Sequence, residues 1–113
     1  MQLAVEELVK IGQLPSEVDP DVELLKTIEN LLKRVEEPVA DDEARALARL
    51  FGPDDCFGLA WSLLHAIETA PGWPLQDVLS GPRNWWIDTL VQRVSNQRRY
   101  AQRPPDEESG TVH

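Results

Sequence analysis

Two side chains of this 113-residue chain stand at a spacing that could support chemistry, His65 and Glu68. Residues three positions apart on an α-helix share a face, so this pair could hold a metal ion or relay a proton. Two ligands without partners complete neither kind of site, because zinc sites use three or four protein ligands. The only other histidine is His113, the last residue of the sequence. We therefore predict that His65 is partly buried and structural, and an enzyme using His65 and Glu68 is the least favoured of three functional hypotheses.

Acidic residues form a second group that could do chemistry, as hard cations prefer several carboxylates on one loop. The D-x-D-x-D-G pattern of a calcium loop is missing, and so are the phosphate-binding G-x-x-x-x-G-K-S/T and the G-x-S-x-G nucleophile turn. The acids instead stand where helices are expected to begin, and there capping and the helix dipole explain them. We expect no catalytic, cofactor or metal-binding residues, and a protein that is not an enzyme. The acids in question are Asp41, Asp42, Glu43, Asp54 and Asp55.

The elements that position these residues are all predicted to be helices. Apolar residues recur every three to four positions from Leu24 to Val35, which is typical of an amphipathic helix, and we place it at residues 20–36 with Asp19 as N-cap and Pro20 at its first position. A weaker pattern at residues 3–11 ends at Gly12. No stretch shows the alternation of a strand.

The second half of the chain contains three further helical segments. One starts at Asp41 or Asp42 and stops before Gly52 and Pro53; the next is capped by Asp54 or Asp55 and is apolar on nearly all sides. A short turn through residues 75–79 leads to a last helix, which we expect Pro82 to open. In that helix the inward stripe is Trp86, Ile87, Leu90, Val91 and Val94.

These patterns predict an all-α protein: a single-domain, irregular bundle of about five helices joined by short loops. Residues 1–103 form the domain, in which residues 1–18 are expected to be loosely attached. Residues 104–113 have the composition of a disordered acidic tail.

Charge is the outlier of the composition, since 20 acidic residues face 11 basic ones, for a net charge of −9. Most acids precede Cys56, whereas the basic residues Arg93, Arg98, Arg99 and Arg103 gather near the end. A field of this sign repels nucleic acid and anionic membranes and speeds encounter with basic proteins. We therefore expect neither a nucleic acid nor a membrane as partner.

The location expected from the sequence is the cytoplasm. The first residues carry acids where a signal peptide has bases, and the apolar runs are too short to span a bilayer. Cys56 is the single cysteine, so no internal disulfide forms, and we expect it to be a small core residue.

Four tryptophans supply much of the aromatic area. Trp85 and Trp86 are consecutive on one helix and point about 100° apart, so both are buried only if two sides of the helix are covered. One of them, or Trp73 in its proline-flanked turn, is a candidate exposed anchor for a partner.

The stretch from Asp42-Glu43-Ala44-Arg45 through Leu50-Phe51-Gly52-Pro53-Asp54-Asp55 to Ala70-Pro71, together with the helix from Trp86 to Asn96, resembles small bacterial immunity proteins of polymorphic and contact-dependent toxin systems. The likeness covers about half of the chain. It implies a single-domain antidote that binds a cognate toxin in the cytoplasm and blocks its active site or a nearby surface. The first 40 residues do not contribute to it.

An acidic surface suits that role, because a toxin that cuts nucleic acid needs a basic cleft. The residues expected to contact the toxin are Asp41, Asp42, Glu43, Asp54 and Asp55 as one patch, Glu36 and Glu37 as its rim, and Trp73 as an anchor. The alternative hypothesis is a non-catalytic helical adaptor or regulatory module in a bacterial protein complex.

Overall fold

The computed structural model describes residues 1–81 and 83–101, and within them the secondary structure is helical, without a strand. Six α-helices and one 3-10 turn occur there. They are α1 (Leu3–Ile11), α2 (Val22–Arg34), α3 (Asp41–Ala48), the turn η1 (Cys56–Gly58), α4 (Leu59–Glu68), α5 (Gln76–Leu79) and α6 (Trp85–Ala101). The all-α prediction is confirmed. The predicted tail at residues 104–113 and Arg103 lie outside the described residues.

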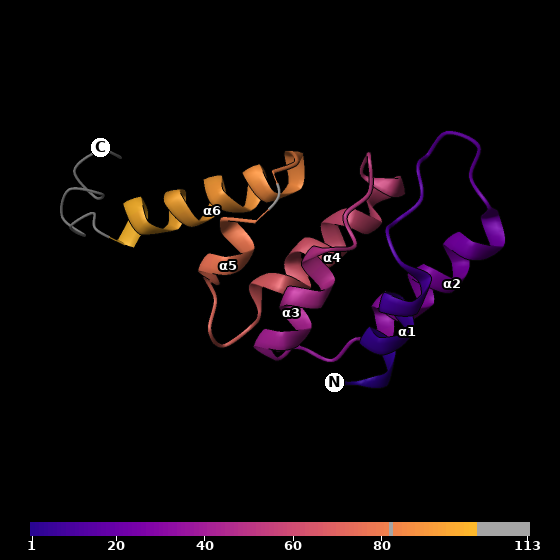
Figure 1. The fold of residues 1–113 in the computed structure, drawn as a ribbon, viewed down its shortest axis with the longest axis horizontal. Coiled ribbons are helices and arrows are strands. Elements are labelled where there is room, and N and C mark those ends of the chain that lie inside the picture. Colours follow the sequence, from indigo (N-terminus) through magenta and orange to yellow (C-terminus); the bar gives the residue numbers. More distant parts are fainter. Residues whose placement is uncertain (82, 102–113) are drawn as a thin grey trace, which may run out of the picture.

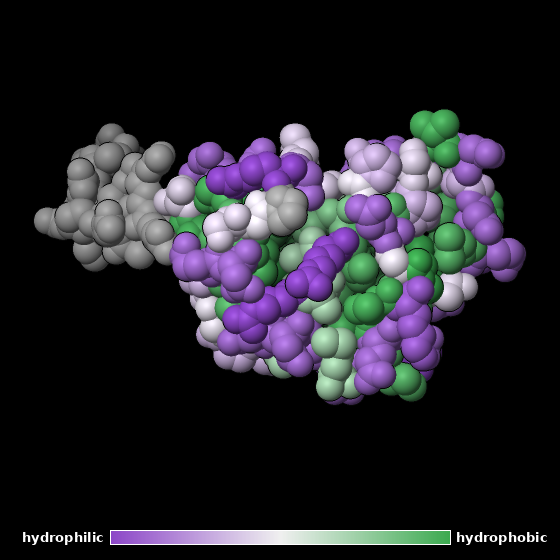
Figure 2. All heavy atoms as spheres, in the orientation of Figure 1, coloured by the Kyte–Doolittle hydropathy of each residue, from purple (hydrophilic) through white to green (hydrophobic). Residues whose placement is uncertain are grey.

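Three pairs of helices follow one another along the long axis of the molecule (Figure 1). α1 and α2 lie side by side at one end, α3 and α4 pack together in the middle, and α5 and α6 form the other end. None of the described helices combines the length and the apolar character needed to cross a membrane. On the face shown in Figure 2, hydrophobic and hydrophilic side chains are interspersed, and green atoms gather over α1.

The N-terminal segment is an integral part of the core, so the expectation of loose attachment is wrong. Val5 and Leu8 are buried in α1, which contacts both α2 and α3. The following loop is also fixed, since Leu14 is buried and its N–H donates to the carbonyl of Leu50 at 2.8 Å. The buried Ala4, Val5 and Leu8 are spaced as one helical face, but the sequence alone does not show which surface that face covers.

Two helix starts differ from the prediction by a few residues. Asp21 caps α2, with its carboxylate accepting from the N–H groups of Glu23 and Leu24, whereas Asp19 adopts a left-handed φ of 58° before the helix. α6 begins at Trp85 and not at Pro82, and the Asn84 side chain accepts from the N–H of Ile87. In both cases the N-cap is an aspartate or asparagine two or three residues later in the chain than predicted, because its side chain accepts from an N–H that has no partner within the helix.

Helix α4 lies in the centre of the bundle, as its composition predicts, and Leu63, Leu64 and Ile67 are buried. Cys56 is fully buried, which confirms its expected place in the core, and burial together with nearby carboxylates raises the pKa of its thiol. His65 is a correction: its side chain is 60% exposed, on the one side of α4 that faces solvent.

Gly52 allows the loop after α1 to pack against the end of α3. A Cβ at this position would overlap the carbonyl of Leu14, which is backbone and cannot rotate away. We expect Gly52→Ala to lower the free energy of unfolding by roughly 1–3 kcal/mol, measured by urea unfolding. Gly81→Ala is the matched control, since its Cβ would meet the carbonyls of Asp77 and Val78 only at an ordinary contact distance of 3.4 Å. An equal loss for both variants would contradict this prediction.

Candidate functional site

The acidic residues predicted to form one patch lie in two places. Asp41, Asp42 and Glu43 start α3, whereas Asp54 and Asp55 follow its end. Eight helical residues span about 12 Å, so α3 separates the two groups. The sequence pattern did not reveal this because both groups stand beside helix ends, and only the packing of those ends shows which are neighbours.

Glu43 is the clearest correction within the predicted patch, because it is a buried structural residue with 5% exposure. Its carboxylate accepts from the backbone N–H of Gln2 at 2.7 Å and from that of Ala40 at 2.9 Å. Burial raises the pKa of Glu43, but these hydrogen bonds outweigh it and hold the pKa below the usual 4.5. Glu43 therefore ties the N-terminus to the start of α3 and is not available to a partner.

The other acids at this end remain at the surface. Asp41 is half-buried and accepts from the N–H of Gly72 at 2.8 Å, which fixes the loop after α4. Asp42 is exposed, and its carboxylate accepts from the N–H of Glu43. Glu36 and Glu37 are exposed, so their role at the rim of an interface stays a prediction.

At the other end of α3, Asp54 organises the loop that leads to α4. Its carboxylate accepts from the N–H of Glu17 at 2.9 Å, from the N–H of Cys56 at 3.0 Å and from the hydroxyl of Ser16 at 3.0 Å. The bond from the Glu17 N–H is the main cause that holds the pKa of Asp54 below its ordinary value. Asp54 thus supplies fixed negative charge, and its oxygens already have donors.

The turn after Asp55 is held in an unusual backbone conformation. Cys56 and Phe57 have left-handed φ values of 48° and 55°, which bulky side chains rarely adopt. The Phe57 N–H donates to the Glu17 carboxylate at 2.7 Å, and the N–H of Gly58 donates to the carbonyl of Asp55 at 3.0 Å. Strained turns of this kind persist only where surrounding contacts determine them, and they are common at functional sites.

Three carboxylates meet at this turn. Oxygens of Glu17, Asp54 and Asp55 lie within 4.8 Å of one another. A hydrogen bond with the Asp55 carboxyl raises the pKa of Glu17, and repulsion by both aspartates adds to it, although the Phe57 N–H acts in the opposite direction. The lysines and arginines whose side chains the structure describes pair elsewhere or not at all, and none pairs with these three acids. The turn is therefore a concentration of negative charge.

Next to the carboxylates lies a cluster of aromatic rings. Trp86 is buried and stacks on Phe51, with ring centroids 5.3 Å apart. Trp61 and Trp85 pack edge-to-face on Trp86, at 4.9 and 4.7 Å, and on each other at 6.0 Å. Trp85 is nevertheless 61% exposed and Trp61 37%. The two outer rings present aromatic surface to solvent at a position fixed by the inner ring.

Two of the carboxylates and the tryptophan rings line one groove of about 240 Å³. It is lined by the loop after α3, by the first turn of α4 and by the start of α6, through Pro53, Asp54, Asp55, Trp61, Trp85 and Trp86. We call it the Trp–Asp groove. Exposed indole rings beside clustered carboxylates suit a ligand that is both cationic and flat or apolar.

Trp73, the predicted anchor, is not at this surface. Its ring is half-buried and packs on the core, and the indole Nε1 is buried without a hydrogen-bond partner among the described residues. The proline-flanked turn folds inward because Trp73 and Leu75 both contribute to the core. The exposed tryptophans are Trp85, which the helix geometry had identified as a candidate, and Trp61.

His65 and Glu68 are engaged differently from the ligands of a metal site or the members of a proton relay. Arg93 binds both carboxylate oxygens of Glu68, at 2.6 and 2.9 Å, and joins α6 to α4. This bond raises the pKa of Arg93. His65 Nδ1 lies 3.7 Å from the same carboxylate. Arg93 is consequently a structural residue and not part of a free basic strip.

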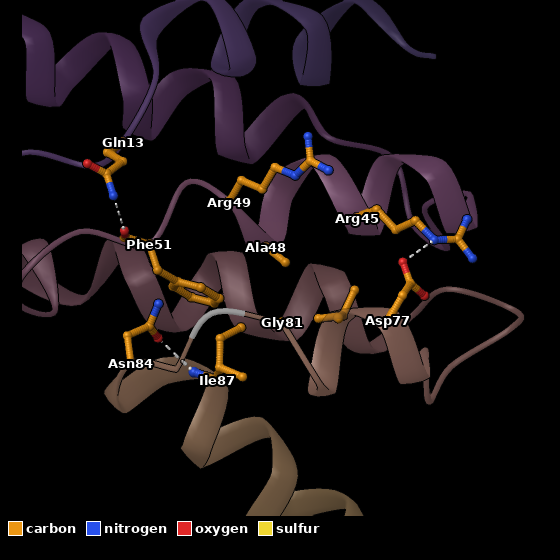
Figure 3. Close-up of a pocket in the computed structure, with 10 residues that line it drawn as sticks. Gln13, Arg45, Ala48, Arg49, Phe51, Asp77, Gly81, Asn84 and Ile87 are labelled. Atoms are coloured by element: carbon orange, nitrogen blue, oxygen red, sulfur yellow. Dashed lines mark hydrogen bonds and ion pairs between the residues drawn. The ribbon is translucent and has the colours of Figure 1, made fainter.

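A second hollow of about 340 Å³ lies between α3, α5 and the start of α6 (Figure 3). Some of its polar side chains are engaged within the protein, whereas the Arg49 guanidinium makes no hydrogen bond or ion pair with the described residues. Arg45 Nε donates to Asp77 at 2.8 Å, and Gln13 donates to the carbonyl of Phe51 at 3.3 Å. These bonds hold α5 and the loop after α1 against α3.

The fold and the site together define a small all-α protein whose surface carries an acidic, tryptophan-lined groove. Comparison with protein-family models, with curated proteins and with solved structures gave no match to this chain.

Proposed function

We propose that this protein neutralises a bacterial toxin by binding it, and that the Trp–Asp groove together with the adjacent carboxylate of Glu17 is the contact surface. The role is the one implied by the resemblance to immunity proteins. The observation that supports it is the exposure of Trp61 and Trp85 directly beside Asp54 and Asp55. Exposed tryptophans held in place by a buried ring are typical of residues that dominate the energy of a protein interface.

Charge determines what kind of toxin fits. The net charge of −9 and the carboxylates of Glu17, Asp54 and Asp55, none of which pairs with a lysine or arginine of the described residues, attract a basic surface over a long range. A toxin that acts on nucleic acid carries such a surface at its cleft, because it must bind phosphate. The groove would therefore cover part of that cleft or lie next to it.

The test is rescue from toxicity. An immunity protein is encoded next to its toxin, so the C-terminal domain of the large protein encoded directly upstream should arrest growth, and co-expression of this chain should restore it. A second readout is a stable complex of the two purified proteins. If neither rescue nor a complex is found, and the chain instead copurifies as a stoichiometric subunit of a larger assembly, the adaptor hypothesis replaces this one.

Reversal of one charge should slow the encounter with the toxin. We expect Asp55→Lys to reduce the association rate constant about tenfold at low salt, because it removes one negative charge from the cluster and adds a positive one. Asp55 is preferable to Asp54, whose oxygens hold the loop. The measurement is surface plasmon resonance at 50 and 300 mM salt.

Asp42→Lys is the matched control, since Asp42 is exposed at the other end of α3. Its effect on the association rate should be clearly smaller than that of Asp55→Lys. Equal slowing by both variants would show that only net charge matters, and no slowing by either would remove the carboxylates from the interface.

A further inference from the structure

We propose that the Trp–Asp groove receives one arginine side chain of the partner protein, with its guanidinium stacked on the face of one of the two outer indoles, Trp61 or Trp85, against the edge of the other, and hydrogen-bonded to Asp55. This inference deepens the proposed function and rests on it for the source of the arginine. It specifies the chemical group that the groove binds, where the proposed function specifies only a basic partner.

The size of the groove limits what can enter. Sites for small molecules occupy roughly 300–1,000 Å³. The groove measures about 240 Å³ and is open on one side, so it accommodates a single long side chain more readily than a whole ligand. An inserted side chain of a partner protein matches this volume.

The aromatic walls favour a flat cation. Trp61 and Trp85 meet at an interplanar angle of 88°, so the surface between them combines the face of one indole with the edge of the other. The face of an indole is electron-rich and attracts cations within about 6 Å. Trp86, beneath both rings, fixes their positions, and the groove is therefore formed before the partner arrives.

The carboxylates add the second requirement. Asp54 has three internal donors, whereas no backbone or side-chain N–H of the described residues donates to the Asp55 carboxylate. Asp55 also lies within hydrogen-bonding range of the Glu17 carboxyl, and the two groups repel each other when both are ionised. A cation placed at Asp55 would relieve this repulsion and gain a charge-assisted hydrogen bond.

Arginine meets both requirements at once, and lysine does not. The guanidinium is planar, is more weakly hydrated than an ammonium group, and offers five donors in one plane, so it can stack on an indole while it donates to a carboxylate beside the ring. The lysine ammonium is a strongly hydrated point charge. A divalent metal ion would use the carboxylates but leave the tryptophans without a role.

The experiment needs no toxin. The full chain, labelled with nitrogen-15, is titrated with N-acetyl-arginine amide, N-acetyl-lysine amide and N-acetyl-norleucine amide, and the indole Nε1–H signals are followed by NMR. We expect the arginine compound to shift the Trp61 and Trp85 signals saturably in the millimolar range and to leave that of Trp73 in place. The Kd of the lysine compound should be at least about threefold higher than that of the arginine compound.

Variants and competing ligands decide the outcome. Trp85→Ala should abolish the response of Trp61, Asp55→Asn should weaken it several-fold, and Asp42→Asn should leave it unchanged. Equal binding of norleucine, equal binding of lysine, or a calcium titration that shifts both signals at lower concentration than arginine does would each overturn the proposal. So would the lack of any saturable shift.

The two proposals can fail separately. If arginine binds but the chain rescues no cell from a toxin, the arginine site stands and the proposed function falls. If rescue succeeds and arginine does not bind, the toxin is held through other contacts and the inference is wrong.

Discussion

Replacement of Trp85 by alanine is expected to weaken binding of the toxin by about 2 kcal/mol or more, close to 30-fold in Kd, with little change in stability. Trp85 is 61% exposed at the first position of α6, so the free protein loses only its edge contacts with Trp61 and Trp86. In the complex the same ring would be desolvated and central. Isothermal titration calorimetry gives the affinity, and thermal unfolding gives the stability.

Leu3→Ala is the control for this prediction. Leu3 is 62% exposed on α1, at the end of the molecule where Gln2 contacts Glu43. Its replacement by alanine removes apolar surface without changing the groove. Its effect on Kd should be below about threefold, as for most residues away from an interface centre. If Leu3→Ala weakens the complex as much as Trp85→Ala does, the prediction is contradicted, because the Trp–Asp groove would not be the centre of the contact surface.

Replacement of Glu43 by alanine is expected to cost about 3 kcal/mol of unfolding free energy, a large part of the stability of a domain of this size. The buried carboxylate accepts from the N–H groups of Gln2 and Ala40, and its loss leaves both donors without their partner. Chemical unfolding at pH 7 measures the loss. Glu37→Ala is the control, because the Glu37 side chain is exposed, and it should stay within about 0.5 kcal/mol of the wild type.

The cost of Glu43→Ala should depend on pH in a defined direction. The folded-state pKa of Glu43 is lowered from 4.5, so the carboxylate stabilises the folded protein at pH values above about 4.5 and ceases to do so as the pH falls below. The difference between wild type and variant should therefore be largest near pH 7 and narrow towards pH 3. A difference that is constant over this range would mean that the charge of Glu43 contributes nothing and only its packing matters.

Much of the fold was predictable because the helices are encoded locally. The inward stripe of α6, for example Trp86, Leu90 and Val94, is visible in the spacing alone and is buried in the structure. The N-cap positions were less predictable. Asp19 and Asp21 are both good caps by residue type, and the choice of Asp21 follows from the path of the preceding loop.

The candidate site was predicted only in part. The sequence predicted Asp54 and Asp55 as acids that contact a partner, which stays a prediction, and it identified Trp85 as one of three tryptophans that could be exposed. The role of Glu17 had no signal in the sequence, because it lies 37 residues or more from the atoms that it contacts, and an acidic residue in a loop is unremarkable by itself. Glu43 was assigned to the surface because its burial depends on the N-terminus folding back over it.

The sequence by itself determined that this chain is helical, acidic and rich in tryptophan, since helical periodicity, net charge and residue type are properties of neighbours along the chain. Only the tertiary structure decided which of these residues share a surface. The contacts that bring Glu17 to Asp54 and Asp55, and Trp61 to Trp85, join segments far apart in sequence, and loop paths and ring packing select them. Local patterns carry no information on such pairings, because burial of one face can be achieved against several different partners.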